Sequence, residues 1–188
     1  YTAPRIVELP DHALMPGLVN LHGHAAMTLM RGFADDLPLM AWLRDRIWPA
    51  EKQHLSEAFV RDGSLIAAAE MLAGGITTTN DMYFFPGAAA EAFLQAGLRA
   101  VLGMIVLEFP SAYAVDADDY LAKGLALRDR LKDEALLSFA FAPHAPYTIT
   151  DATFGRINTL AEQLGVPIHT HIHETADEIA NSLRDFGQ

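Results

Sequence analysis

Short apolar segments alternate with longer segments of helical periodicity along this chain. Five such apolar segments span residues 18–21, 76–80, 100–107, 136–142 and 166–172. Nearly continuous apolar strands are typical of a parallel sheet that is covered on both faces, because helices connect its strands. The alternation therefore predicts an α/β fold made of strand–helix units.

Capping signals mark the ends of the helical segments. The first segment has an apolar face from Leu55 to Leu72 and stops at Gly74, because glycine readily ends a helix. Further helices are predicted from about 87 to 96 before Gly97, from about Asp116, from Thr150 or Asp151 to Gly165, and from 176 to 186.

The spacing of the units selects one kind of parallel sheet. After the second strand the units repeat every ~25–35 residues, close to the ~30 residues of each unit in an eightfold barrel. A doubly wound sheet is disfavoured, because the first turn after the strand at 18–21 lacks the glycine-rich phosphate-binding pattern. We therefore predict a (β/α)8 TIM-type barrel, present here as roughly its first five βα units.

Polar residues gather where the predicted strands end, and active sites of such barrels lie at that end. These residues are His22 and His24, Asp81, Glu108, His144, and His171 with Glu174. Five units leave open sheet edges, so the chain is predicted to be the front portion of a longer protein. Residues 1–15 are predicted to form the edge of a small β-rich domain, and residues 16–188 the truncated hydrolase barrel.

Composition excludes several classes of function. Asp and Glu total 24 against 13 Lys and Arg, for a net charge of −11, and this field repels nucleic acid. The absence of cysteine excludes a disulfide framework and cysteine-based zinc sites. No apolar run reaches the ~18 residues of a membrane span, which favours a cytoplasmic protein without a membrane partner. Because the chain starts at Tyr1, a lost leader stays open.

Two histidine clusters end apolar strands. Residues i and i+2 of a strand share a face, so His22 and His24 would aim two imidazoles at one point. The second cluster places His169, His171 and His173 on one face. Buried core histidines are the alternative, but unpartnered imidazoles are costly to bury. The pattern predicts a divalent metal site, although spacing alone does not select a ligand from the second cluster.

Several motifs resemble those of the amidohydrolase superfamily. Residues 15–24 resemble its opening strand, and residues 171–175 resemble its fifth strand, in the branch of cytosine, guanine and adenosine-type deaminases. Further matching pieces, in family order, are Trp42-Leu43, Trp48-Pro49-Ala50-Glu51, Gly75–Thr79, Asp81–Tyr83 and Pro143–Tyr147. More closely, the chain resembles the 5′-methylthioadenosine/S-adenosylhomocysteine deaminases, which are grouped with the triazine hydrolases.

The resemblance implies a metal centre held by His22, His24 and His171, with zinc or iron(II) as the ion. It places His169 in the core and His173 beside the ligands. It also implies an aspartate ligand and a catalytic histidine on later strands that this chain does not contain. Hydroxide formed at the metal would attack the amine-bearing ring carbon. Glu174 would shuttle protons to the ring nitrogen and to ammonia, unless it is only a favourable charge at a helix N-terminus.

The resemblance also implies substrate contacts, mostly from the long connection that spans residues 28–52. Trp42 would line the purine pocket, Glu51 would bind ribose hydroxyls, and His144 would donate to a ring nitrogen. The alternatives are loop packing for Trp42, a solvated charge for Glu51, and a capping or supporting role for His144. The expected partner is therefore a purine nucleoside or a related heterocycle, and the resemblance also allows a homo-oligomer.

One departure from the family pattern bears on the substrate. Where an arginine could clamp the amino-acid carboxylate of S-adenosylhomocysteine, the chain reads Gly103-Met104-Ile105. Its absence favours the apolar methylthio group, although Arg31 and Arg44 could substitute. The alternative functions are a related amidohydrolase acting on guanine, an oxopurine or pterin, or a chlorotriazine, and an inactive fragment or non-catalytic barrel scaffold.

Overall fold

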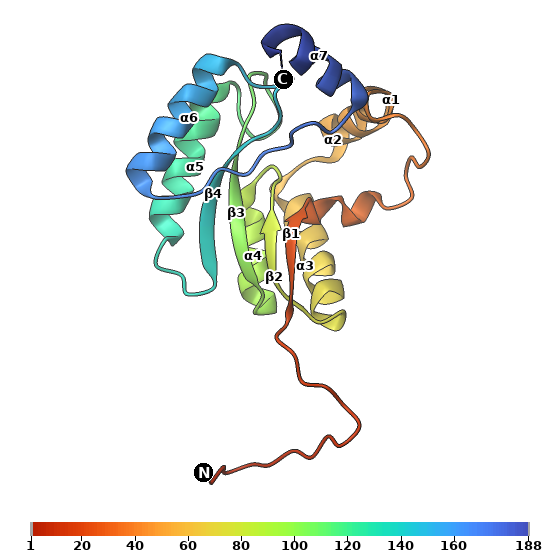
Figure 1. Ribbon diagram of the computed structural model, residues 1–188, viewed down its shortest axis with the longest axis vertical. Helices are drawn as coiled ribbons and strands as arrows, with labels where there is room; N and C mark the ends of the chain where they lie inside the picture. Colours follow the sequence, from red (N-terminus) through yellow and green to blue (C-terminus); the bar gives the residue numbers. More distant parts are fainter. Residues whose placement is uncertain (1, 188) are drawn as a thin grey trace.

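A computed structural model describes residues 2–187, whose centre is a four-stranded parallel sheet (Figure 1). The strands lie in the order β1 (Leu18–Gly23), β2 (Ile76–Asp81), β3 (Arg99–Val106) and β4 (Leu137–Pro143). Every neighbouring pair is parallel. The predicted α/β fold with a parallel sheet is thus confirmed.

The predicted fifth strand, residues 166–172, is not a regular strand. It follows β4 in parallel through a single bridge between Phe141 and Ile168. The Phe141 N–H donates to the Pro167 carbonyl at 2.9 Å, and the His169 N–H donates to the Phe141 carbonyl at 2.8 Å. Pro167 has no N–H to donate, and the described residues supply no strand on its other side, so only part of a ladder forms.

The helices that connect the strands agree with the capping signals. They are α3 (Glu57–Ala73), α4 (Pro86–Ala96), α5 (Ala117–Leu131), α6 (Asp151–Leu164) and α7 (Ala176–Phe186). The side chains of Asp116, Thr150 and Thr175 cap α5, α6 and α7. Gly97 and Gly165 end α4 and α6 with φ angles of 72° and 64°. The ends of α4, α5 and α6 confirm the prediction, whereas the Thr175 cap of α7 was not predicted. Such ends depend on local chemistry.

The connection after β1 differs from the predicted loop. It begins with the 3-10 helix η1 (Ala25–Met30), then continues through α1 (Leu39–Trp42), a π-helical turn η2 (Leu43–Ile47) and α2 (Trp48–His54). Leu39, Leu43 and Ile47 recur every fourth residue, so they share one face of this helical segment. Figure 1 shows α1 and α2, together with α7, at the end of the sheet toward which the strands point.

The main core lies between the sheet and its helices. Fully buried side chains from α4, α5 and α6, namely Phe93, Tyr120 and Ile157, belong to one cluster with Leu102 and Phe141 of the sheet. This packing holds the strands rigidly and so fixes the positions of the residues at their carboxyl ends.

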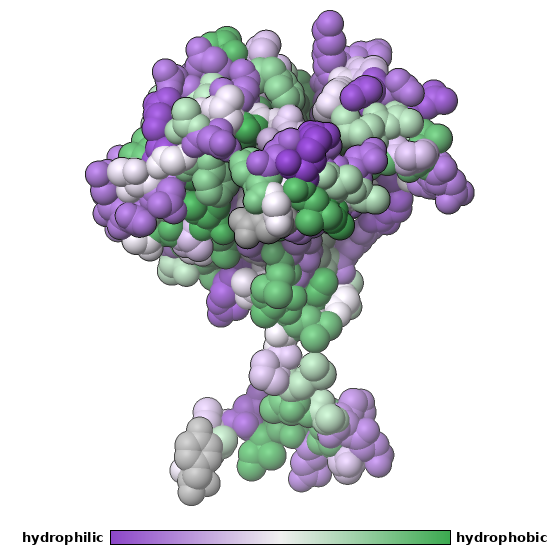
Figure 2. All heavy atoms as spheres, turned by 45° about the horizontal axis from the view of Figure 1, so that its top comes forward, coloured by the Kyte–Doolittle hydropathy of each residue, from purple (hydrophilic) through white to green (hydrophobic). Residues whose placement is uncertain are grey.

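The N-terminal segment, residues 2–17, contains no helix or strand and extends away from the body (Figures 1 and 2). It exposes apolar side chains, namely Ile6, Val7, Leu9, Leu14 and Met15. The small β-rich domain expected here stays a prediction. Tyr1 and Gln188, the outer ends of the two predicted domains, lie outside the described residues. Within residues 2–187, no helix has the length and apolar character needed to cross a membrane.

Close packing at Gly63 predicts a large effect of a small substitution. A Cβ atom at this position of α3 would lie 2.5 Å from the Ala26 carbonyl oxygen in η1. We expect Gly63→Ala to lower the free energy of unfolding by about 1–3 kcal/mol, because backbone must move. Chemical denaturation of the intact protein measures this change.

Gly155→Ala in α6 is the matched control, because nothing lies within 4 Å of its Cβ position. Alanine favours a helix over glycine by about 1 kcal/mol, so this variant should be as stable as the parent or more stable. Equal destabilisation by both substitutions would show that the contact between α3 and η1 is not the cause.

Candidate metal centre and adjoining cavity

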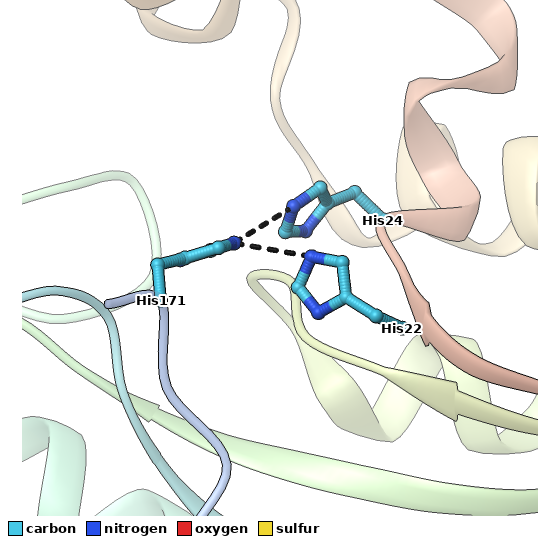
Figure 3. A group of neighbouring side chains, drawn as sticks. All are labelled: His22, His24 and His171. Atoms are coloured by element: carbon cyan, nitrogen blue, oxygen red, sulfur yellow. Dashed lines mark hydrogen bonds between the residues drawn. The ribbon is translucent and has the colours of Figure 1, made fainter. Parts of the chain in front are cut away.

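Three imidazoles converge at the carboxyl end of the sheet (Figure 3). His22 lies in β1 and His24 directly follows it, whereas His171 follows the segment that pairs with β4. The His171 Nε2 atom lies 3.1 Å from Nε2 of His22 and 3.3 Å from Nε2 of His24. The three candidate ligand atoms lie within 4.8 Å of one another, so the two distant clusters form one site.

Main-chain carbonyls set the tautomers of two of these imidazoles. Nδ1 of His24 lies 2.5 Å from the Met82 carbonyl oxygen, and Nδ1 of His171 lies 2.8 Å from the His144 carbonyl oxygen. A carbonyl only accepts hydrogen bonds, so in the neutral ring each Nδ1 carries the proton. Nε2 is then left with a lone pair that faces the shared centre, as metal coordination requires.

The three residues fit a divalent metal. Two nitrogens that bind one tetrahedral zinc at ~2.0–2.1 Å lie about 3.3 Å apart, close to the separations of 3.1 and 3.3 Å. Burial lowers the pKa of His24 to about 4, and neighbouring imidazoles add to this effect. Burial also lowers the pKa of His22. Both rings are therefore neutral at pH 7, the form in which imidazole binds metal.

His169 does not lie in the core, where it was expected. Its Nε2 atom lies 2.8 Å from Nδ1 of His22, the ring nitrogen that faces away from His171. Burial lowers the pKa of His169 to about 4, with His22 and His171 contributing. His169 is therefore a neutral imidazole in direct contact with a candidate ligand.

A cavity of about 640 Å³ adjoins the imidazole cluster. His24 and His171 line one part of it, and the helical segment 39–54 forms another wall. The wall is largely apolar and includes Leu39, Trp42, Leu43, Ile47, Trp48, Leu107 and Phe109. Trp42, Glu51, His144 and Glu174, the four residues expected to act on the substrate, all line this cavity.

Tyr83 holds Glu51 at the cavity wall. The Tyr83 hydroxyl donates to Oε1 of Glu51 at 2.7 Å. Burial raises the pKa of Glu51, and the hydrogen bond from Tyr83 opposes this effect. Glu51 is therefore a partly buried carboxylate with a fixed orientation, which disfavours the alternative of a solvated surface charge.

His144 is anchored on one side of its ring. Its Nδ1 atom lies 3.1 Å from the Thr148 hydroxyl oxygen, which leaves Nε2 for a ligand in the cavity. Burial lowers the pKa of His144 to about 3, and His171 and His24 contribute. At neutral pH the ring is therefore uncharged and suited to hydrogen bonding with a neutral heterocycle.

Glu174 lies in a tight turn between His171 and α7. The Glu178 carboxylate accepts the N–H groups of His173 and Glu174 at 2.8 and 2.9 Å. His173 adopts a φ of 54°, a left-handed conformation that is uncommon among residues other than glycine. The Tyr147 hydroxyl donates to Oε2 of Glu174 at 3.1 Å. Glu178 thus holds the main chain of Glu174, and Tyr147 holds its carboxyl group.

The supporting residues were not identified from sequence. Thr175 and Glu178 form a Thr-x-x-Glu pattern at a helix start, which is a readable capping-box signal. Tyr83 and Tyr147 occur within the family-like motifs, but nothing in the local sequence assigns them to Glu51 and Glu174. The side chain of His173 does not line the cavity. His173 contributes to this turn through its main-chain N–H, which donates to the Glu178 carboxylate.

The arginines considered as carboxylate clamps do not reach the cavity. Arg31 pairs with Glu70 through two hydrogen bonds of 3.0 and 2.6 Å. Arg44 does not line the cavity either, and Lys52 is the one lining residue with a permanent positive charge among residues 2–187. The cavity therefore offers an apolar surface with a single cation.

Comparison with known proteins places this geometry in a family. The model of the amidohydrolase family matches residues 13–188. A protein from Saccharophagus degradans named 5-methylthioadenosine/S-adenosylhomocysteine deaminase is 51% identical over 181 residues, 96% of this chain and 41% of that protein. A protein of the same name from Teredinibacter turnerae is 50% identical over 188 residues, 100% of this chain and 42% of that protein. The chain belongs to the amidohydrolase family.

Solved structures agree with this assignment. A crystal structure of an adenosine deaminase from Xanthomonas campestris with bound zinc has a TM-score of 0.91 and 52% identity, covering 95% of this chain and 41% of that one. A triazine hydrolase from Arthrobacter aurescens shares the fold at 21% identity and a TM-score of 0.80, covering 92% of this chain and 43% of that one. The chain spans about two fifths of the length of the curated relatives it matches. The partial amidohydrolase barrel predicted from sequence is confirmed.

Asp81, at the end of β2, predicts a pH dependence of stability. It is 3% exposed, its Oδ1 accepts the Ala25 N–H at 2.6 Å, and burial raises its pKa to about 7. Because this pKa is higher than in the unfolded chain, the folded state binds more protons between about pH 4 and pH 7. The contribution of Asp81 to stability therefore falls as pH rises through this window.

We expect Asp81→Asn to reduce this pH dependence, because asparagine still accepts from Ala25 but does not ionise. Between pH 4 and pH 7 the parent should lose on the order of 1–4 kcal/mol relative to the variant. Urea denaturation of the metal-free protein at several pH values measures the difference. Parallel pH profiles for the two proteins would contradict the elevated pKa.

Proposed function

We propose that the intact protein is a metal-dependent hydrolytic deaminase of 5′-modified adenosines, with 5′-methylthioadenosine as the preferred substrate. The observation that carries the proposal is the convergence of three imidazoles beside a largely apolar cavity that Glu174 also lines. The names of the relatives from Saccharophagus degradans and Teredinibacter turnerae support this substrate class. S-adenosylhomocysteine and adenosine are further candidate substrates.

His22, His24 and His171 would hold the metal, which we propose to be zinc, with iron(II) as the alternative. The zinc bound to the Xanthomonas campestris deaminase supports this choice. When bound, a divalent metal lowers the pKa of water to about 7 and so supplies a nucleophile at neutral pH. Burial lowers the pKa of both His22 and His24, so these two rings bring no charge of their own to oppose a cation.

Glu174 is proposed as the proton shuttle. Glu174 takes a proton from the attacking water and gives it to the ring nitrogen as the C–O bond forms at the amine-bearing carbon. It then takes the remaining hydroxyl proton and gives it to the amine nitrogen, which leaves as ammonia when the C–N bond breaks. The Tyr147 hydroxyl, 3.1 Å from Oε2, and the turn held by Glu178 keep this carboxyl group at the cavity wall. Such positioning is a large part of a catalytic advantage.

The cavity wall suits a nucleoside with an apolar 5′ group. Trp42 offers an aromatic surface for the purine, Glu51 has a carboxylate oxygen for ribose hydroxyls, and Nε2 of His144 can contact a ring nitrogen. The apolar lining favours a methylthio group, and Lys52 is the lining cation that a carboxylate could pair with. The cytoplasmic location, the absence of nucleic-acid and membrane partners, and a homo-oligomeric state stay predictions.

The activity itself is the first test. The intact protein should release ammonia from 5′-methylthioadenosine with a shift in ultraviolet absorbance. Removal of metal with a chelator should abolish turnover, and added zinc should restore it, because the nucleophile depends on the metal. Full activity without metal would refute the mechanism. Faster turnover of guanine, a pterin or a chlorotriazine would move the protein to the related substrate classes.

The role of Glu174 is tested by Glu174→Gln in the intact protein. Loss of proton transfer should lower kcat by about 10²–10⁴-fold with little change in KM, and zinc content should stay the same. Steady-state kinetics and metal analysis measure these quantities.

Asp177→Asn is the matched control, because Asp177 is an exposed acid in the first turn of α7. If Glu174 were only a favourable charge at this helix end, both variants would retain kcat and lose no more than about 1 kcal/mol of stability. That outcome would remove Glu174 from the reaction.

A further inference from the structure

His169 has no task in the proposed reaction, yet it contacts a proposed metal ligand. Its Nε2 atom lies 2.8 Å from Nδ1 of His22, and the two rings are nearly perpendicular at 84°. The residues are 147 positions apart in the sequence, so the contact joins β1 to the segment beside β4. This contact is on the opposite side of the His22 ring from His171.

A single proton lies between these two nitrogens when both rings are neutral. If Nδ1 of His22 carries the proton, Nε2 of His22 has a lone pair for a metal. If Nε2 of His169 carries it instead, the proton of His22 sits on Nε2 and blocks coordination. The direction of this one hydrogen bond therefore decides whether His22 can be a ligand.

The other two imidazoles have no such choice. His24 and His171 donate to the carbonyl oxygens of Met82 and His144, which cannot donate in return. His22 alone among the three has a partner that is itself able to donate or accept. The tautomer of His22 consequently depends on His169.

We propose that His169 is a positioning residue that accepts the Nδ1 proton of His22 and so keeps Nε2 of His22 available to the metal. The inference rests on the metal site of the proposed function. Partners of this kind, which hold the second nitrogen of a metal-bound imidazole, commonly change metal affinity by 10–100-fold.

A second observation favours a role for His169 outside packing. Its other nitrogen, Nδ1, is buried and has no hydrogen-bond partner within residues 2–187. In the proposed arrangement this nitrogen carries the proton of His169. Buried polar atoms are rarely left unpaired in folded proteins, so packing alone does not account for an imidazole at this position.

Zinc affinity of the intact protein tests the proposal. His169→Leu keeps the bulk and removes the acceptor, and we expect its dissociation constant for zinc to rise 10–100-fold. In His169→Gln the amide oxygen can take the place of Nε2, so the affinity should stay within about threefold of the parent. His54→Leu, which removes an exposed imidazole at the end of α2, should leave affinity unchanged. Competition with a chromophoric chelator measures all four proteins.

Nitrogen NMR of the metal-free parent gives a readout that needs no variant to fold. Long-range proton–nitrogen spectra should show Nδ1 of His22 protonated and Nε2 of His169 unprotonated. The reverse assignment would overturn the proposal, as would parental zinc affinity in His169→Leu or an equal loss in His169→Gln. A parent with the expected spectrum that binds no zinc would refute the metal centre itself, and with it the role of His169.

Discussion

The candidate site depends on hydrogen bonds that hold the outer nitrogens of its imidazoles. Met82 follows β2 and His144 follows β4, and their carbonyl oxygens bind Nδ1 of His24 and His171. In each case the carbonyl follows one strand, and the imidazole lies on a neighbouring segment: His24 follows β1, and His171 follows the segment that pairs with β4. The parallel sheet therefore sets the tautomers, the ring directions and the 3.1 and 3.3 Å separations of the Nε2 atoms together.

The same end of the sheet combines two different environments. The imidazoles are close together, and burial together with mutual repulsion keeps His24, His144 and His169 uncharged at neutral pH. Beside them the cavity is mostly apolar, with Glu51 and Glu174 each fixed by a tyrosine hydroxyl. A low-polarity wall strengthens the few polar interactions that a bound heterocycle would make.

Much of the fold could be predicted from sequence because its signals are local. Apolar runs marked the strands, and capping residues or terminal glycines marked α3 to α6. The prediction of a regular strand at residues 166–172 was wrong. Pairing of this segment depends on neighbouring strands, which the run of apolar residues does not reveal. The helical character of residues 39–54 was missed, since a stripe of Leu39, Leu43 and Ile47 was treated as a long connection.

The residues that line the site could be named from motifs, whereas the contacts between them could not. His169 and His22 are 147 positions apart, and Tyr147 is 27 positions from Glu174. No spacing rule relates such pairs, and only folding brings them together. The exception is Glu178, because its Thr-x-x-Glu pattern with Thr175 is local and could have been recognised from the sequence.

The helical wall of residues 39–54 has a consequence for how the proposed activity could change. Its cavity-lining side chains recur along one helical segment, whereas the three candidate metal ligands lie at the carboxyl end of the sheet. Part of the cavity wall is thus encoded apart from the three imidazoles, whereas Leu107, Phe109 and His144 line the cavity from segments that follow the strands. In the proposed reaction, substitutions in residues 39–54 would change the shape of the cavity and leave the three imidazoles in place. Substrate preference could then change while the candidate metal centre stays the same.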